Sequence, residues 1–176
     1  MSICMDTSFD FSERILYVCI VIFRMSHVAK RLFLDLIHLT NMRYIHTRKL
    51  SRKSKNKLFS VLERLLERYR DDIVVRIIGL NIRKGTNRFR KYAFIEKLIS
   101  QIAQTQKFEI NNIIVPTDLN TGNYKLCDAI RKRLNKPVVV VEENTHYCVQ
   151  IADAIINLYR HKKELPTEFS YSRHNC

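Results

Sequence analysis

Asp153 is the only charged residue between Tyr147 and Tyr159, in a run that is otherwise mostly apolar and is typical of a buried helix. Leaving a carboxylate unpaired in apolar surroundings costs on the order of several kcal/mol. Such a residue is therefore paired with a partner, turned toward solvent, or bound to a metal ion. From the residues alone, a core carboxylate held by a Lys or Arg or capping a backbone group is as good an interpretation as a metal ligand.

Two other acids stand at comparable positions. Asp6 is expected at the end of the first strand, and Asp118 follows the strand-like residues 113–115, just past Pro116. Side chains at strand ends can converge on one edge of a sheet, where a helix packed across that edge adds a third ligand. Two Mg²⁺ ions need several carboxylate oxygens and open positions for water and a phosphate. The three acids therefore predict a site for metal-dependent phosphodiester hydrolysis, in which one metal activates water and the other stabilises the leaving oxygen.

Short apolar strands and amphipathic helices would have to position these acids. Strand patterns occupy residues 2–6, 13–23, 73–82, 110–115 and 137–141. Helical spacing occupies residues 25–39, 53–69, 87–106, 123–134 and 147–161. Residues 7–12 look like a turn, and residues 42–50 are ambiguous, with a strand-like centre at 44–46. The alternation predicts an α/β, three-layer domain over residues 1–165, with a central mixed sheet flanked by helices, and a loosely ordered tail over residues 166–176.

A family resemblance sharpens this interpretation. Residues 149–156 (Val-Gln-Ile-Ala-Asp-Ala-Ile-Ile) resemble the Leu-Gln-Leu-Ala-Asp-Leu helix of the RNase H-like proteins grouped as domain of unknown function 3800. Those proteins begin with a strand ending Asp-Glu-Ser-Gly, which residues 5–8 resemble imperfectly, and the order of elements is similar over about residues 2–163. The resemblance implies an RNase H-like fold and a metal-dependent nuclease. Asp6, Asp118 and Asp153 would be the catalytic acids that hold Mg²⁺ or Mn²⁺, and Gln150, one helical turn before Asp153, would orient the site.

Two positions depart from the family pattern. Thr7 replaces the Glu of the first motif, and Tyr44 stands where a Glu precedes the position of His46 in a Glu-Leu-His-Ala segment of some members. Glu142, after the last predicted strand, could offset the loss of these carboxylates as a metal ligand, although an exposed strand-end charge is the alternative. The same fold therefore also predicts a catalytically degenerate protein that binds nucleic acid without cleaving it.

A net charge of +14, from 31 Lys and Arg against 17 Asp and Glu, favours a polyanionic partner, most simply DNA or RNA. Two basic clusters fall in stretches without acids, between Asp35 and Glu63 and between Asp72 and Glu96. A solvated basic face, or a protein partner with an acidic surface, is the alternative. Phosphate contacts would give strong salt dependence and little sequence information. The predicted nucleic-acid contacts are Arg48, Lys49, Arg52, Lys53, Arg88, Arg90 and Lys91.

Five cysteines, an odd number without the spacing of a zinc site, indicate reduced thiols and a cytoplasmic or otherwise intracellular protein. Cys19 and Cys148 lie in apolar runs and are expected to be small core residues. The longest uncharged apolar run, residues 15–23, is too short to span a membrane, so no membrane partner is expected. Asp6, Asp10 and Glu13 argue against a signal peptide at the start.

Overall fold

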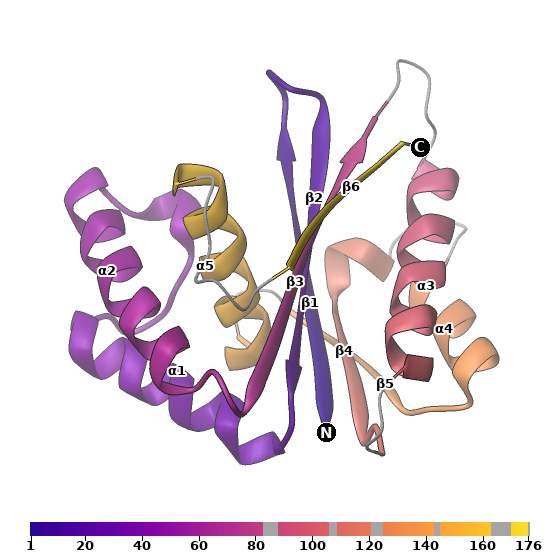
Figure 1. The fold of residues 1–176 in the computed structure, drawn as a ribbon, viewed down its shortest axis with the longest axis horizontal. Helices are drawn as coiled ribbons and strands as arrows, with labels where there is room; N and C mark the ends of the chain where they lie inside the picture. Colours follow the sequence, from indigo (N-terminus) through magenta and orange to yellow (C-terminus); the bar gives the residue numbers. More distant parts are fainter. Residues whose placement is uncertain (83–87, 106–108, 121–124, 143–144, 163–169, 176) are drawn as a thin grey trace.

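A computed structural model describes residues 1–82, 88–105, 109–120, 125–142, 145–162 and 170–175. Its helices lie on both faces of a central sheet (Figure 1). The strands are β1 (Ser2–Asp10), β2 (Ile15–Phe23), β3 (Ile73–Asn81), β4 (Asn112–Pro116), β5 (Val138–Val141) and β6 (Ser170–Asn175). The helices are α1 (Ser26–Thr40), α2 (Arg52–Arg68), α3 (Arg88–Thr105), α4 (Leu126–Leu134) and α5 (Tyr147–Lys162), with short 3-10 turns η1 (Thr47–Lys49) and η2 (Thr117–Asn120).

The sheet is mixed, as the sequence predicts. Its strand order is β5-β4-β1-β2-β3-β6. β1, β2 and β3 form an antiparallel meander, whereas β4 pairs in parallel with β1, and β5 with β4. Each parallel partner is reached through a helix, which is the usual way to join parallel strands. β1 therefore lies inside the sheet, between the hairpin strand β2 and the later strand β4.

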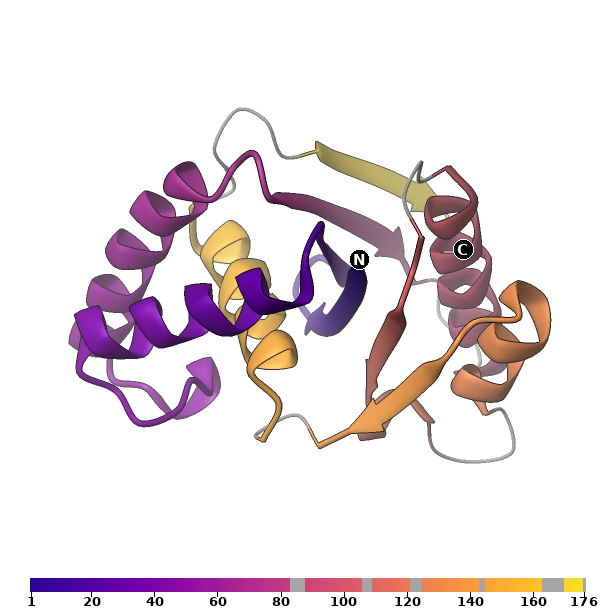
Figure 2. The ribbon, with the colours of Figure 1, turned by 90° about the horizontal axis from the view of Figure 1, so that it is seen from below.

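Two apolar cores cover the two faces of the sheet. The first core lies between the sheet and α1, α2 and α5, and the second lies between the sheet and α3 and α4 (Figures 1 and 2). β2 is apolar at every position because its alternate side chains enter both cores, for example Cys19 the first and Ile20 the second. α5 packs directly on β1 and β2, and α1 and α2 pack on α5. Among the helices of the described residues, α5 is the most buried.

β1 is longer than its predicted extent, and this changes the place of one candidate acid. The antiparallel pairing continues through Thr7↔Val18 as far as Asp10, so Asp6 lies in the middle of the strand. The prediction that Asp6 ends the strand is wrong because the polar residues after it are paired with β2 instead of forming a turn. The reversal comes later, where Arg14 adopts a left-handed conformation with φ 52°.

Part of the tail predicted to be loosely ordered, residues 166–176, lies in a strand, and the rest of it is outside the described residues. Residues 170–175 form β6, which pairs in parallel with β3 at the edge of the sheet. Their sequence, Ser-Tyr-Ser-Arg-His-Asn, has no apolar alternation and gave no strand signal. The domain boundary at residue 165 stays a prediction. In the described residues, no helix is long and apolar enough to cross a membrane.

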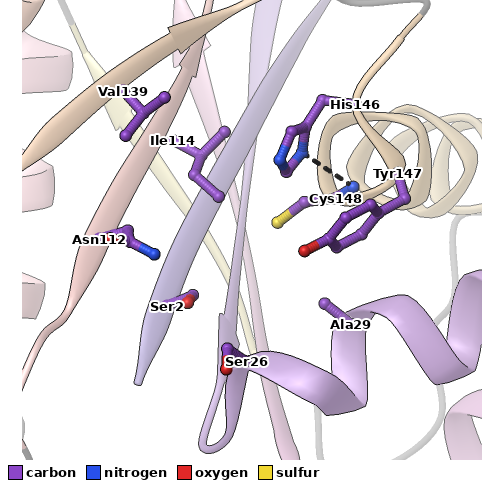
Figure 3. Close-up of a pocket in the computed structure, with 9 residues that line it drawn as sticks. All are labelled: Ser2, Ser26, Ala29, Asn112, Ile114, Val139, His146, Tyr147 and Cys148. Atoms are coloured by element: carbon purple, nitrogen blue, oxygen red, sulfur yellow. Dashed lines mark hydrogen bonds between the residues drawn. The ribbon is translucent and has the colours of Figure 1, made fainter.

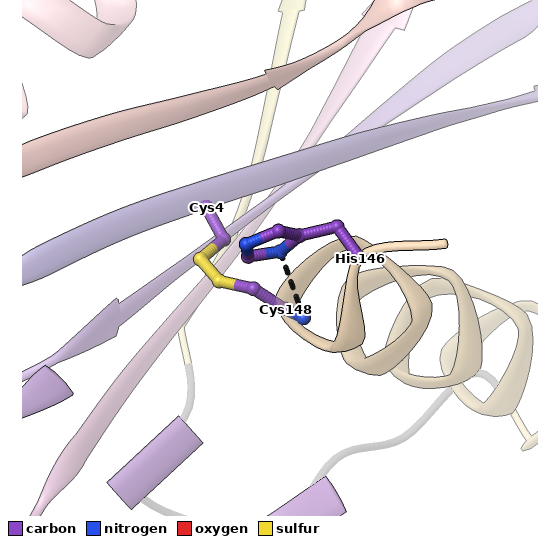
Figure 4. The surroundings of a disulfide bond; sticks show 3 residues. All are labelled: Cys4, His146 and Cys148. Atoms are coloured by element: carbon purple, nitrogen blue, oxygen red, sulfur yellow. Dashed lines mark hydrogen bonds between the residues drawn. A yellow bond between two sulfur atoms is a disulfide. The ribbon is translucent and has the colours of Figure 1, made fainter. Parts of the chain in front are cut away.

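A disulfide crosses the first core. It joins Cys4 of β1 to Cys148 of α5, with their Cα atoms 6.0 Å apart (Figure 4). Cys148 is buried, as expected, but it is not the reduced thiol that the odd cysteine count indicated. Cys19 and Cys127 are free and buried. Sequence spacing could not reveal the pair because its members are 144 positions apart and meet only when α5 packs on β1.

Candidate functional site

Asp153 holds a distant segment of the chain against α5. Its side chain is only 4% exposed, and its Oδ2 accepts a hydrogen bond from the backbone N–H of Thr47 at 3.0 Å. The Thr47 hydroxyl also donates to Oδ2 at 3.0 Å, and Asn157 Nδ2 donates to Oδ1 at 2.7 Å. The carboxylate is thus well supplied with donors. This is the backbone-capping core carboxylate that the sequence left open as an alternative.

Gln150 acts on the same segment from one turn earlier in α5. Its Oε1 accepts a hydrogen bond from the backbone N–H of Ile45 at 2.7 Å. Gln150 is as buried as Asp153, and Ile45 and Thr47 are each 1% exposed. The side chains of Gln150 and Asp153 therefore hold residues 45–49 against α5 through hydrogen bonds. We call residues 45–49 the anchored segment. The strand-like centre predicted at residues 44–46 is not a strand; the segment ends in η1.

Burial and hydrogen bonding oppose each other at Asp153. Burial raises the pKa of this carboxyl above its usual value, because the charged form loses its hydration. The hydrogen bonds from Thr47, and to a smaller extent electrostatic interactions with His46 and Arg48, lower the pKa and so offset part of this rise. The anchored segment thus contributes both the donors and the positive charges that favour the ionised form.

Asp6 also faces the first core. The Cys19 thiol lies within electrostatic range of both Asp6 and Asp153. Asp6 is 2% exposed and lies opposite Cys19 in the β1–β2 register. Burial raises the pKa of the Cys19 thiol well above its ordinary value, and the carboxylates of Asp6 and Asp153 raise it further. Two of the three predicted acids are therefore within electrostatic range of one thiol, under α5.

The other two acids of the prediction lie at the surface. Asp118 is exposed in η2, directly after β4 as predicted, and its backbone carbonyl accepts a hydrogen bond from the Tyr92 hydroxyl at 3.1 Å. The parallel register pairs Cys4 with Ile114, so two residues further on Asp6 comes level with Pro116, and Asp118 follows beyond it. Glu142 is exposed at the end of β5.

These side chains do not fit the two-metal site that the three acids predict. Across the described ranges, no three His, Cys, Asp or Glu side chains are grouped closely enough to hold a metal ion. The Asp153 carboxylate is engaged by Thr47 and Asn157, and Asp118 lies outside at the surface whereas Asp6 lies inside. We therefore derive no metal-dependent step from this arrangement.

A pocket of about 220 Å³ opens at the start of α5, beside the disulfide (Figure 3). His146 and Tyr147 stack there with ring centroids 4.5 Å apart, and His146 Nδ1 accepts a hydrogen bond from the Cys148 N–H at 3.3 Å. Burial lowers the pKa of His146, which favours the neutral ring. The remaining walls are uncharged and are formed by Ser2, Ser26, Ala29, Asn112, Ile114 and Val139. This pocket therefore does not match a polyanionic ligand.

The first predicted basic cluster is exposed and compact. Arg48, Lys49, Arg52 and Lys53 are all exposed, and they run from η1 into the first turn of α2. Ser51 caps this helix, with its hydroxyl oxygen accepting from the backbone N–H of Ser54 at 3.2 Å. We call residues 48–53 the α2 basic segment. It shares residues 48 and 49 with the anchored segment, which Gln150 and Asp153 hold in place through Ile45 and Thr47.

The second predicted basic cluster lies on the other side of the sheet. Arg90 is exposed near the start of α3, and Lys91 Nζ lies 5.7 Å from the ring centroid of Phe9. Arg88 begins α3, but its side chain is outside the described part of the structure. Figure 1 shows α2 and α3 on opposite faces of the sheet, so the two clusters do not form one continuous surface.

The most informative residues that the sequence did not single out are the partners of Asp153. Asn157 follows Asp153 by four positions, and its Nδ2 also donates to the Asp153 carbonyl at 2.8 Å. This spacing is a recognisable helical pair and could have been found. Thr47 gave no such signal because it is 106 positions away and belonged to an ambiguous stretch.

Comparison with solved structures agrees with this topology. No protein-family model matches this chain, and no curated protein matches it either. The ribonuclease H2 of Pyrococcus horikoshii OT3 superposes with a TM-score of 0.59 at 12% identity, covering 92% of this chain and 72% of that chain. The RNase HII of Archaeoglobus fulgidus, solved in a complex with PCNA, gives 0.51 at 14% identity, covering 93% and 73%.

The chain has an RNase H-like fold. The fold class predicted from the sequence is therefore confirmed. In this RNase H-like domain, Asp6 lies on the interior strand β1, and α5 packs over it with Gln150 and Asp153 turned toward the anchored segment. At 12–14% identity the likeness concerns the fold alone.

Proposed function

We propose that this protein binds nucleic acid through the α2 basic segment of its RNase H-like fold. The observation that carries the proposal is the placement of four exposed cations directly after Thr47, which α5 fixes by a hydrogen bond, as it does Ile45. The four cations are Arg48, Lys49, Arg52 and Lys53. Cations on a fixed backbone lose less conformational freedom on binding than cations on a free loop. The net charge of +14 supports a polyanionic partner.

The start of α2 adds a second attraction for phosphate. A helix N-terminus presents unpaired backbone N–H groups and a partial positive charge, both of which favour anions. The Ser51 cap uses one of those N–H groups, that of Ser54, and the first turn of α2 carries no acid. The α2 basic segment thus combines side-chain and backbone attraction for a phosphate backbone, without groups that would read a base sequence.

Metal-dependent cleavage is the second candidate, and the shared neighbourhood of Asp6 and Asp153 around Cys19 favours it. It would make the protein a nuclease of the RNase H-like family called domain of unknown function 3800, which residues 149–156 resemble. Against it stand the engaged carboxylate of Asp153 and the exposed position of Asp118. We therefore rank binding without cleavage first, on the same fold.

Binding is tested by fluorescence anisotropy with labelled single- and double-stranded DNA and RNA at several salt concentrations. We expect the affinity to fall linearly on a log–log plot, with a slope of about 0.9 per phosphate contact on duplex DNA and about 0.7 on single strands. Affinity that does not change with salt, or no binding at low salt, would contradict the proposal.

Cleavage is tested on the nucleic acid that binds, with Mg²⁺ or Mn²⁺ and with EDTA. We expect no metal-stimulated product from the parent protein. If product does appear, and the Asp6→Asn variant binds equally well but no longer forms it, the second candidate replaces the first. A product that persists unchanged in Asp6→Asn points to a contaminating nuclease, and the first candidate then stands.

A further inference from the structure

A second pocket, of about 240 Å³, lies between α2 and α5. Lys55 and Phe59 line it from α2, and Asn157, Arg160 and His161 line it from α5. A water molecule occupies about 30 Å³ of liquid, so the pocket has room for a phosphate group and several waters. None of these residues belongs to the α2 basic segment or to the set of predicted contacts.

Three of the five lining side chains are basic, and one of them is fixed by the sheet. Arg160 donates from its Nη1 to Ser8 Oγ at 2.7 Å, and its Nη2 lies 3.5 Å from Asp10 Oδ2. Among the described residues, Lys55 and His161 have no ion pair of their own. The single carboxylate beside Arg160 therefore leaves the pocket with excess positive charge.

One donor of Arg160 lacks an acceptor. Within the described part of the chain, Arg160 Nε is buried and has no hydrogen-bond partner. A guanidinium offers five N–H donors in a rigid fork, and a buried N–H left unpaired is unfavourable. Natural structures usually satisfy such a group with a protein atom, a water or an ion. Because Nε is buried, an ion in the pocket does not contact it directly, and the part of Arg160 that lines the pocket is the 29% of its side chain that is exposed.

The other walls make an anion a better occupant than a neutral donor. Phe59 is 4% exposed and its ring centroid lies 5.5 Å from that of His161, so one side of the pocket is aromatic. A low-polarity wall strengthens charge-assisted hydrogen bonds to the cations opposite. Asn157 Nδ2 donates hydrogen bonds to both the carbonyl and the carboxylate of Asp153, so this amide does not compete with the cations for an anion in the pocket.

From this geometry we propose that the pocket binds a phosphate group, held by Lys55, Arg160 and His161. We assign that phosphate to a nucleic-acid backbone running from the α2 basic segment along α2, because Lys55 lies on that helix two residues after Lys53, the last residue of the segment. The backbone assignment rests on the proposed function, whereas phosphate binding by the pocket does not.

Phosphate binding is tested by titrating inorganic phosphate into ¹⁵N-labelled protein at constant ionic strength. The Nε–H resonance of Arg160 is expected to shift and saturate. Lys55→Ala and His161→Gln should each weaken phosphate affinity about tenfold, the effect of one charge-assisted hydrogen bond. Lys132→Ala, an exposed lysine on α4 in the opposite layer, is the charge-matched control and should leave the affinity unchanged. An Arg160 resonance that phosphate does not shift, or an equal loss of phosphate affinity in Lys132→Ala, would overturn phosphate binding by this pocket.

The source of the phosphate is tested with the same variants and a labelled oligonucleotide. If the backbone occupies the pocket, Lys55→Ala lowers the salt-dependence slope by about one contact, and inorganic phosphate competes at that contact. A variant that loses phosphate affinity but keeps the parent's oligonucleotide affinity overturns the backbone assignment and supports a free phosphate. Phosphate binding by a parent protein that binds no oligonucleotide supports the pocket and contradicts the proposed function.

Discussion

The Asp153 carboxylate accepts a hydrogen bond from the backbone N–H of Thr47, a residue 106 positions earlier in the chain. Together with the bond from Ile45 to Gln150, it places the anchored segment on the surface of α5. The motif that resembles a catalytic helix thus has a positioning role in this structure. The hydrogen bonds from Gln150 and Asp153 therefore also fix the position of the basic residues that follow Thr47.

The Thr47–Asp153 contact should be visible as an energetic coupling. Thr47→Val removes the hydroxyl donor but keeps the backbone N–H bond to Asp153, and it should lower the free energy of unfolding by about 0.5–1.5 kcal/mol. Asp153→Asn replaces an acceptor oxygen by an amide donor among the donors of Thr47 and Asn157, and it should cost about 1–3 kcal/mol. The double variant should be less destabilised than the sum by at least about 0.5 kcal/mol. Urea unfolding measures all four proteins. Asp128→Asn, which removes an exposed ion pair with Arg131, should change stability by less than about 1 kcal/mol.

Additive effects of Thr47→Val and Asp153→Asn would contradict the hydrogen bond between the Thr47 hydroxyl and the Asp153 carboxylate. A large effect of Asp128→Asn would instead show that the assay responds to any loss of negative charge.

Asp153 should make the protein less stable as pH rises. Burial raises the pKa of this carboxyl in the folded state above its unfolded value of about 3.9, so between these two values the folded state binds more protons. Its contribution to stability therefore falls as pH increases from about 4 and levels off above the folded pKa. Unfolding free energies measured from about pH 3.5 upward should show this slope in the parent and not in Asp153→Asn. An identical slope in both would rule out this source.

Asp10 should have the opposite effect at lower pH. Hydrogen bonds from the Ser12 hydroxyl and the Glu13 N–H lower the pKa of Asp10 to about 2, with a smaller contribution from Arg160. Its contribution is complete above the unfolded value of about 3.9 and is lost as pH falls toward about 2. Asp10→Asn should therefore flatten the acid side of the stability profile, as followed by circular dichroism. An unchanged acid limb would show that Asp10 titrates normally.

The disulfide should stabilise the fold by about 2–5 kcal/mol, because it closes most of the chain into one loop. Adding a reductant should lower the urea midpoint of the parent, while Cys148→Ser should unfold at one midpoint with or without reductant. Peptide mass spectrometry of the unreduced protein should recover Cys4 linked to Cys148. Free thiols at both positions, or equal reductant sensitivity in Cys148→Ser, would contradict the bond.

The two basic clusters should contribute unequally to nucleic-acid binding. Replacing Lys49 and Arg52 with Gln should weaken binding to a short oligonucleotide and lower its salt-dependence slope by up to about two contacts. Replacing Arg90 and Lys91 with Gln removes the same charge from the opposite layer and should have a smaller effect. Anisotropy titrations compare the two variants directly. Equal losses would mean that net charge, rather than the α2 basic segment, drives binding.

Regular elements with strong apolar periodicity were predictable. β2, β3, β5, α2 and α5 all lie within about two residues of their predicted bounds, because one or both faces of each element enter a core. β1 was predicted too short, since the polar residues Thr7 and Ser8 resemble a turn until their pairing with β2 is known. Pairing with a neighbour, not residue type, extends that strand.

The candidate site was predictable only as a set of acids, of which Asp6 and Asp153 are buried and Asp118 is exposed. Asp153 could be predicted as a site residue because an unpaired charge in an apolar helix is unfavourable. Gln150 could be predicted because it lies on the same helix face as Asp153. Their actual partners, Thr47 and Ile45, come from a segment without periodicity. The resemblance of residues 44–47 to a Glu-Leu-His-Ala segment pointed to this stretch, but it did not predict these hydrogen bonds. Asp118 and Asp6 are each close to their predicted place in the sequence order, yet one is exposed and the other buried.

The position of β1 inside the sheet has a consequence for biosynthesis. β1 is made first, but its parallel partner β4 begins at Asn112 and its covering helix α5 at Tyr147. At roughly 5–20 residues per second, these elements leave the ribosome several seconds to half a minute later. During that interval Asp6 and Cys4 lack their final cover, and the nascent β1–β2–β3 meander exposes apolar surface. Completion of the sheet and of its cover must therefore wait until α5 has been made.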